Sequence, residues 1–201
     1  MRILIVRHAE RNSMPSEKGL DIAGFNEDLV PINSEGTQTA ISLGNSLASE
    51  FKYIYYSPIL RCEQTAIALS KKSGMNIEGP LNYLSSKYFS ELDGLDEKTK
   101  QMLVDGMLTG KINQKFTIDH YISLLERMNF VLRRFEQAND GSVFVTHDWW
   151  MALFLSWHTN IFEYHGYSIW PKFLEYFVID YERKVIAYRD FQFKLPQPLQ
   201  A

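Results

Sequence analysis

Residues 1–11, MRILIVRHAER, place an apolar run directly before a group of charged residues. The run at residues 3–6, ILIV, is typical of a strand that is buried on both faces inside a parallel sheet. It ends in Arg7 and His8, and Arg11 follows three residues later. Because buried charge is costly without a partner of opposite charge, this pattern predicts that an anion binds at the end of the strand.

The composition of the 201-residue chain is that of a globular protein with a sizeable core. Hydrophobic residues make up 45% and charged residues 22%, which favours a single domain over residues 1–201 and excludes a disordered chain. A net charge of -3 provides no general attraction to nucleic acid or to an anionic membrane, so the anion site must be local. The single cysteine, Cys62, excludes an internal disulfide and favours a cytoplasmic location. No apolar stretch approaches the roughly 20 residues of a membrane-spanning helix.

The order of the expected elements is typical of an α/β sheet, in which strands and helices alternate. Apolar spacing predicts helices over residues 35–51, 61–72 and 120–137, strands over 53–56 and 142–146, and a C-terminal hairpin that turns at 181–183. Asn33 or Ser34 is the expected cap of the first helix. Residues 79–119 are less regular, and we expect them to form a small lid or insertion.

Two of the expected buried strands end in histidine. The first strand leads into His8, and the strand over residues 142–146 leads into His147 and Asp148. Ligands of open α/β sheets bind beyond the carboxyl ends of the strands, so the two histidines are expected to meet there. Neither belongs to an HxxxH or HxH pair, and neighbouring arginines repel cations, so we expect no metal. The forked donors of arginine suit phosphate, which predicts a phosphoryl-binding pocket.

Four segments together resemble the histidine phosphatase superfamily, which includes the cofactor-dependent phosphoglycerate mutases. They are RHAER at 7–11, PINSEGTQTA at 31–40, SPILRCEQTA at 57–66 and VTHD at 145–148. The resemblance implies a three-layer α/β/α sandwich with a mostly parallel central sheet and helices on both faces.

The resemblance also implies a role for each matching residue. His8 would be the nucleophile that becomes phosphorylated, and Arg7, Arg61 and His147 would bind the transferring phosphoryl group. An imidazole attacks phosphorus only through an unprotonated nitrogen, and the nearby arginines are expected to lower the pKa of His8. They would also neutralise the charge on the phosphoryl oxygens, so no cofactor is expected.

The proton donor is less clearly marked than the nucleophile. The mutase-like branch of the family uses a glutamate in a block that LSSKYFSELDGL, residues 84–95, resembles, but Ser86 stands at that position. Glu91 lies nearby, although a solvated loop carboxylate is its simpler interpretation. The other candidate is Asp148, because a His-Asp pair at this strand end resembles the acid-phosphatase branch. Arg11 agrees with that branch, whose RHxxR opening adds a second arginine to the phosphate pocket. A helix N-cap is the alternative interpretation of Asp148.

These residues predict a phosphatase that hydrolyses a phosphate monoester through a phosphohistidine, with His8 as nucleophile and Asp148 as general acid and base. The expected substrate is a small-molecule phosphate ester or a phosphoprotein. The loop over residues 12–31, the insertion and the aromatic residues after Asp148 would set specificity. The alternatives are a phosphomutase, which Ser86 disfavours, and a phospho-ligand binding module without turnover. The oligomeric state is left open.

Overall fold

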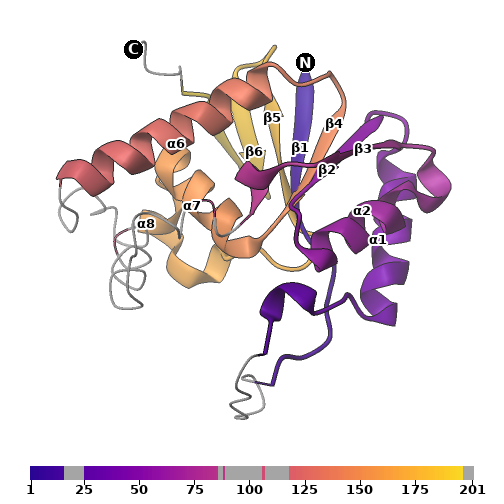
Figure 1. Cartoon of the computed structure of the whole chain (residues 1–201). Helices are drawn as coiled ribbons and strands as arrows, with labels where there is room; N and C mark the ends of the chain where they lie inside the picture. The colour runs from indigo at the N-terminus through magenta and orange to yellow at the C-terminus, as the bar shows by residue number, and fades with distance from the viewer. Residues whose placement is uncertain (16–24, 86–87, 89–105, 107–117, 197–201) are drawn as a thin grey trace.

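A computed structural model describes residues 1–15, 25–85, 88, 106 and 118–196 of the chain (Figure 1). Within these residues seven strands form one sheet in the order β3-β2-β4-β1-β5-β6-β7. The strands are β1 (Arg2–Arg7), β2 (Tyr53–Tyr56), β3 (Asn76–Pro80), β4 (Ser142–Thr146), β5 (Tyr176–Asp180), β6 (Val185–Tyr188) and β7 (Phe191–Lys194). β1, β4, β2 and β3 pair in parallel, whereas β5, β6 and β7 continue the sheet through antiparallel pairs.

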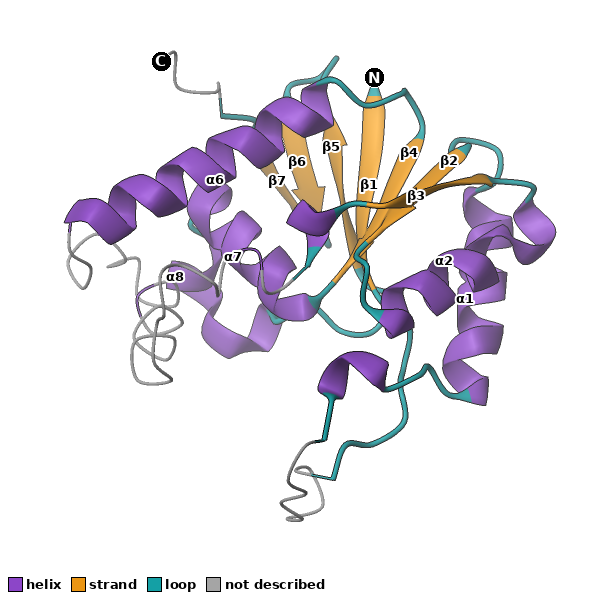
Figure 2. Cartoon of the chain, in the orientation of Figure 1, coloured by secondary structure: helices purple, strands orange, loops and turns teal. Residues whose placement is uncertain are grey.

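Helices cover both faces of the sheet (Figure 2). One face carries α1 (Ser34–Leu47) and α2 (Leu60–Ser73), and the other carries α6 (Ile118–Glu136), α7 (Asp148–Thr159) and α8 (Ile161–His165). Short 3₁₀ turns are η2 (Glu27–Leu29), η3 (Asn82–Leu84) and η4 (Gly166–Ile169). This arrangement confirms the expected α/β/α fold. None of the described helices combines the length and apolar character needed to span a membrane.

β1 lies in the middle of the sheet and contributes to the core on both faces. Leu4 and Val6 pack with α1 and α2, whereas Ile3 and Ile5 pack with α6 and α7, and all four are 0% exposed. The alternation follows from the two-residue period of a strand. Since both faces of β1 are held, the residues that follow Val6 start from a rigid support.

Two edge strands were not among the expected elements. β3, with the sequence NIEGP, is exposed along most of its length, and β7, with FQFK, alternates between half-buried and exposed residues. An edge strand needs no continuous apolar run, so the pattern that marks buried strands is absent from both. Most of the insertion expected over residues 79–119 lies outside the described residues; Gly79 and Pro80 complete β3.

Glycines allow α1 to approach its neighbours closely. A Cβ atom at Gly44 would overlap the backbone carbonyl of Leu69 in α2, and one at Gly36 would overlap the backbone of Glu10, two residues after His8. Asn33 caps α1, as one of the two expected capping residues, by accepting a hydrogen bond from the Gly36 N–H at 2.7 Å. The first helix is therefore tied to α2 and to the loop that follows β1.

We expect Gly44→Ala to lower the free energy of unfolding by about 2 kcal/mol, because the added methyl group forces α1 away from α2. Alanine exceeds glycine in helix propensity by roughly 1 kcal/mol, so a loss of stability identifies the close approach as the stronger effect. Urea denaturation compares this variant with Ser42→Ala, at an exposed position of the same helix, which should change stability by less than about 0.5 kcal/mol. A Gly44→Ala protein as stable as the wild type would contradict the close packing.

Candidate active site

The carboxyl ends of β1 and β4 bring two histidines together. Arg7 is in register with Thr146, and the His8 N–H donates a hydrogen bond to the Thr146 carbonyl at 2.9 Å. His147 follows Thr146, and its ring centre lies 5.5 Å from that of His8 in an edge-on arrangement. Each histidine is only 2% exposed. Parallel pairing of two adjacent strands thus produces the meeting that the sequence predicts.

The ring of His8 has a defined protonation state. Its Nδ1 lies 2.8 Å from the Ala9 carbonyl oxygen, which can only accept, so Nδ1 carries the hydrogen. Its Nε2 lies 3.2 Å from Arg61 Nε, which can only donate, so Nε2 carries a lone pair. The Ala9 N–H in turn donates to Thr65 Oγ1 at 2.9 Å, which ties this loop to α2. His8 is therefore a neutral imidazole with its free nitrogen on the arginine side.

Burial and nearby charge keep both histidines neutral. The pKa of His8 is lowered to about 3. Burial is the largest cause and the charges of Arg61 and Arg7 act in the same direction, whereas the hydrogen bond to the Ala9 carbonyl opposes them. Burial, followed by the neighbouring His8 and Arg61, also holds the pKa of His147 well below its ordinary value. A neutral imidazole is the form that can attack phosphorus.

Arg61 connects three parts of the site. Its Nη1 donates to the Glu27 carbonyl in η2 at 2.9 Å, and its Nη2 lies 3.4 Å from His147 Nδ1. Since His147 Nδ1 accepts from Arg61, His147 Nε2 carries the hydrogen and donates to Ser57 Oγ at 2.9 Å. Arg61 lies in the first turn of α2, where the helix dipole disfavours a cation unless an anion is close.

Arg7 is held by two contacts and keeps one donor without a hydrogen-bond partner in the described part of the chain. Its Nη2 forms an ion pair with Asp148 Oδ2 at 3.0 Å, and its Nη1 donates to the Pro171 carbonyl at 2.8 Å. Its Nε is buried and has no hydrogen-bond partner among the described residues. A buried cationic N–H without an acceptor is unusual, and a phosphoryl oxygen is the kind of acceptor that it suits.

Asp148 is the first residue of α7 and not its N-cap. The N-cap is His147, which keeps the extended backbone of β4 with φ −116° and ψ 156°, so the N-cap interpretation of Asp148 is wrong. Asp148 Oδ1 accepts from the Trp149 N–H at 2.8 Å, and Oδ2 accepts from Trp170 Nε1 at 3.3 Å. Its side chain is 31% exposed, so a carboxylate lies at the rim of the site within reach of solvent.

Arg11 belongs to the edge of the same group of charges. It forms an isolated bridge with Ile32, and its Nη1 donates to the Asn12 carbonyl at 3.1 Å. Burial is the main cause that lowers the pKa values of Arg7 and Arg61, and the charge of Arg11 contributes to both. We refer to Arg7, Arg11 and Arg61 as the arginine cluster.

The other sequence candidates either lie outside the described residues or do not suit the chemistry of the site. Ser86 and Glu91 lie outside the described residues. Cys62 Sγ lies 3.5 Å from His147 Nε2, but burial raises the pKa of its thiol to about 12, which suits packing and not nucleophilic attack. Within the described ranges no group of three or more His, Cys, Asp or Glu side chains could hold a metal ion. Two further residues contact the histidines and were not predicted from the sequence. Ser57 Oγ accepts a hydrogen bond from His147 Nε2, and the ring centre of Phe173 lies 5.7 Å from that of His8.

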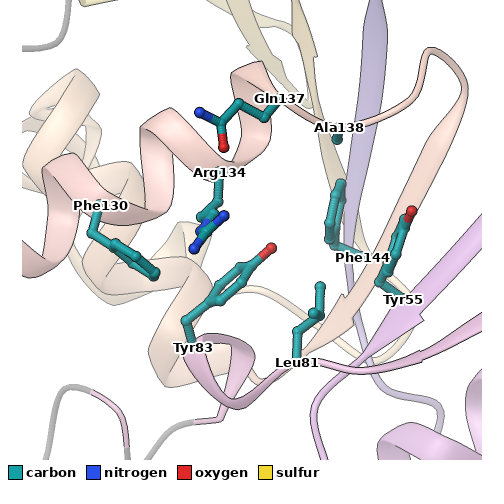
Figure 3. A pocket seen from close by; sticks show the side chains of 8 residues that line it. All are labelled: Tyr55, Leu81, Tyr83, Phe130, Arg134, Gln137, Ala138 and Phe144. Atoms are coloured by element: carbon teal, nitrogen blue, oxygen red, sulfur yellow. The ribbon is translucent and has the colours of Figure 1, made fainter.

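A cavity of about 410 Å³ lies elsewhere, between the C-terminal half of α6 and the sheet (Figure 3). Its lining comes from β2, β4, α6 and the residues that follow β3 and α6: Tyr55, Leu81, Tyr83, Phe130, Arg134, Gln137, Ala138 and Phe144. None of the histidines or arginines described above lines it. It is therefore separate from the candidate active site.

Comparison with known families and structures places these features in context. The sequence model of the histidine phosphatase superfamily (branch 1) matches residues 3–191. No curated protein matches the chain in sequence.

Three solved structures illustrate the similarity in fold. A phosphoserine phosphatase from Entamoeba histolytica, in complex with 3-phosphoglyceric acid, has a TM-score of 0.59 at 16% identity, over 96% of this chain and 97% of that one. A phosphoglycerate mutase from Bacillus anthracis has a TM-score of 0.56 at 15% identity, over 96% and 91%. A putative phosphohistidine phosphatase from Agrobacterium tumefaciens has a TM-score of 0.51 at 16% identity, over 94% and 95%. At such low identity these structures show the fold.

A third histidine, the half-buried His158, allows a test of how pH acts on stability. The ring of His158 lies 4.4 Å from that of Phe154, and its Nε2 has no hydrogen-bond partner among the described residues. Burial lowers its pKa to about 4. Between pH 6.5 and 4 the unfolded chain therefore binds a proton that folded His158 does not, so the free energy of unfolding falls as the pH falls.

We expect His158→Phe to reduce this pH dependence by about 1 kcal/mol per pH unit between pH 6 and 5. Urea denaturation at several pH values measures the slope, which does not depend on how much the variant changes stability at a single pH. His165→Phe, at an exposed histidine, serves as the control and should keep the wild-type slope. Equal slopes for His158→Phe and the wild type would show that His158 titrates alike in the folded and unfolded chain.

Proposed function

Because this chain belongs to the histidine phosphatase superfamily (branch 1), we propose that it is a phosphatase that hydrolyses a phosphate monoester through a phosphohistidine. The state of His8 is the observation that carries the proposal. Its Nδ1–H is bound to the Ala9 carbonyl, and its Nε2 lone pair is directed towards Arg61. The substrate is a small-molecule phosphate ester or a phosphoprotein.

In the first step the phosphoryl group binds at the arginine cluster. The free Arg7 Nε supplies one donor, and Arg61 Nε exchanges its bond to His8 Nε2 for a bond to a phosphoryl oxygen. This exchange releases the lone pair of His8, which attacks phosphorus as the bond from phosphorus to the ester oxygen breaks. Positioning and charge neutralisation supply most of the catalysis in such a transfer.

Asp148 is the proposed proton donor to the departing ester oxygen. In the free protein its Oδ2 is paired with Arg7 Nη2 at 3.0 Å, an arrangement that suits the ionised carboxylate. A bound phosphoryl dianion competes with Asp148 for Arg7, so Oδ2 of Asp148 becomes available to hold a proton and to donate it to the ester oxygen.

In the second step water attacks phosphorus in phosphorylated His8. Asp148, now ionised, accepts a proton from that water, and the bond between Nε2 and phosphorus breaks to release inorganic phosphate. The exposed fraction of Asp148, 31% of its side chain, supports this role, because the attacking water must enter from solvent.

The central test replaces the nucleophile. We expect His8→Ala to reduce phosphate release from a panel of phosphate esters by about a thousandfold or more, because the variant lacks the imidazole that forms the intermediate. The assay contains a chelator, so activity in the wild type also tests the proposal that no metal is needed. His165→Ala, an exposed histidine on α8, is the matched control and should retain wild-type rates.

The products separate the proposed function from its alternatives. Inorganic phosphate indicates a phosphatase, whereas an isomerised phosphate ester indicates a mutase. Binding of esters without either product indicates a module that has lost turnover. Retained phosphate release in His8→Ala would overturn the proposed mechanism.

The proton donor has a test of its own. We expect Asp148→Asn to slow hydrolysis of an alkyl phosphate by roughly 100-fold or more, because the alkoxide leaving group needs a proton. Formation of the phosphoenzyme from nitrophenyl phosphate should slow much less, because nitrophenolate leaves without one. Rapid-mixing kinetics measures both rates, and Glu163→Gln, at an exposed carboxylate of α8, is the control. Equal losses for the two esters would contradict the acid role.

A further inference from the structure

An aromatic side chain lies beside the proposed nucleophile. The ring of Phe173, in the segment between η4 and β5, has its centre 5.7 Å from the ring centre of His8. The guanidinium carbon of Arg7 lies 4.1 Å from the same ring centre, within the range of a cation–π interaction. Phe173 nevertheless remains 38% exposed, so part of the residue is open to solvent.

The segment that carries Phe173 is tightly attached to β1. Leu174 adopts the left-handed backbone conformation, with φ 57°, and its N–H donates to the His8 carbonyl at 3.4 Å. The Arg7 N–H donates to the Glu175 carbonyl at 3.0 Å, and the Glu175 side chain is bound by Arg189 Nε at 2.6 Å. A left-handed conformation is unfavourable for leucine, so these contacts hold Phe173 at a position that the chain would not adopt by local preference.

A second aromatic side chain borders the proposed proton donor. Trp170 Nε1 donates to Asp148 Oδ2 at 3.3 Å. The Trp170 ring packs edge-on against buried Phe162, with the ring centres 5.9 Å apart, and Tyr167 lies 5.7 Å away. Trp170 and Phe173 thus contact the two members of one ion pair, Asp148 and Arg7.

The position of this ion pair indicates where the organic part of a substrate lies. If Asp148 protonates the ester oxygen, that oxygen lies within hydrogen-bond distance of its carboxyl group, and the first carbon atoms of the alcohol lie close to Trp170 and Phe173. We propose that the preferred substrates carry a flat apolar ring on the ester oxygen, as in a benzyl or phenyl ester, and that this ring packs on Phe173 and Trp170. This inference rests on the proposed function for the placement of the ester oxygen.

Aromatic packing favours this class over small polar alcohols. Offset or edge-on contact between rings adds to the gain from covering apolar surface, and the exposed part of Phe173 is the surface that a substrate ring would cover. Phe173 is therefore a specificity-determining residue in this proposal, and Trp170 both orients Asp148 and forms the adjacent wall.

Binding of phosphonates tests the inference without requiring turnover. Calorimetry compares benzylphosphonate with ethylphosphonate on the whole protein, and we expect benzylphosphonate to bind about tenfold more tightly. Phe173→Ala should reduce this ratio to less than about threefold, because the contact surface is gone. Phe130→Ala is the matched control: Phe130 is 40% exposed, similar to Phe173, but it lines the separate cavity in Figure 3 and should leave the ratio unchanged.

Several results would overturn the inference: equal affinity for the two phosphonates, no binding of either, an unchanged ratio in Phe173→Ala, or an equal fall in Phe130→Ala. Because Phe173 also contacts Arg7, its loss can weaken both ligands, and the ratio removes that shared effect.

Hydrolysis of benzyl and ethyl phosphate, whose alcohols are similar in acidity, gives the parallel kcat/KM ratio. Phosphate release without a benzyl preference would reject the ring site but keep the phosphatase. A benzyl preference in binding without phosphate release would keep the ring site but reject the phosphatase.

Discussion

The candidate site depends on how the fold accommodates several arginines next to two neutral histidines. Burial at the ends of β1 and β4 disfavours the charged form of any side chain there. It lowers the pKa of His8 and of His147, so both histidines remain unprotonated. The arginines stay charged, and Arg7 and Arg61 use part of their donors on carbonyls and on Asp148. What remains, including the buried Arg7 Nε, is a set of donors suited to a dianion.

The same contacts link the binding residues to the rest of the fold. Arg61 touches His8, His147 and η2, so its position depends on α2 and on the loop after β1. Arg7 touches the first residue of α7 and the segment before β5. The side chains around His8 are therefore held in place by elements on both faces of the sheet.

Sequence patterns predicted the buried elements well because burial leaves a clear apolar period. The β1 and β4 strands, α1, α2 and the long α6 all carry such a period, and their order is that of the α/β fold. The edge strands β3 and β7 carry none, and the pattern missed them. The interpretation of Asp148 as an N-cap was wrong, because the extended backbone of β4 continues through His147. An apolar period does not place the first residue of a helix to within one position.

The class of fold follows from the sequence, because apolar periods mark the buried strands and helices. The sequence also groups His8 with His147, because the carboxyl ends of parallel strands lie at one edge of a sheet, and the resemblance of its segment to one family adds Arg61. Three features could be read from the folded chain alone: which nitrogen of His8 carries the lone pair, the pairing of Arg7 with Asp148, and the position of Phe173 and Trp170 beside that pair. These features depend on contacts between residues far apart in the chain, and side-chain directions at strand ends follow from packing and not from local periodicity.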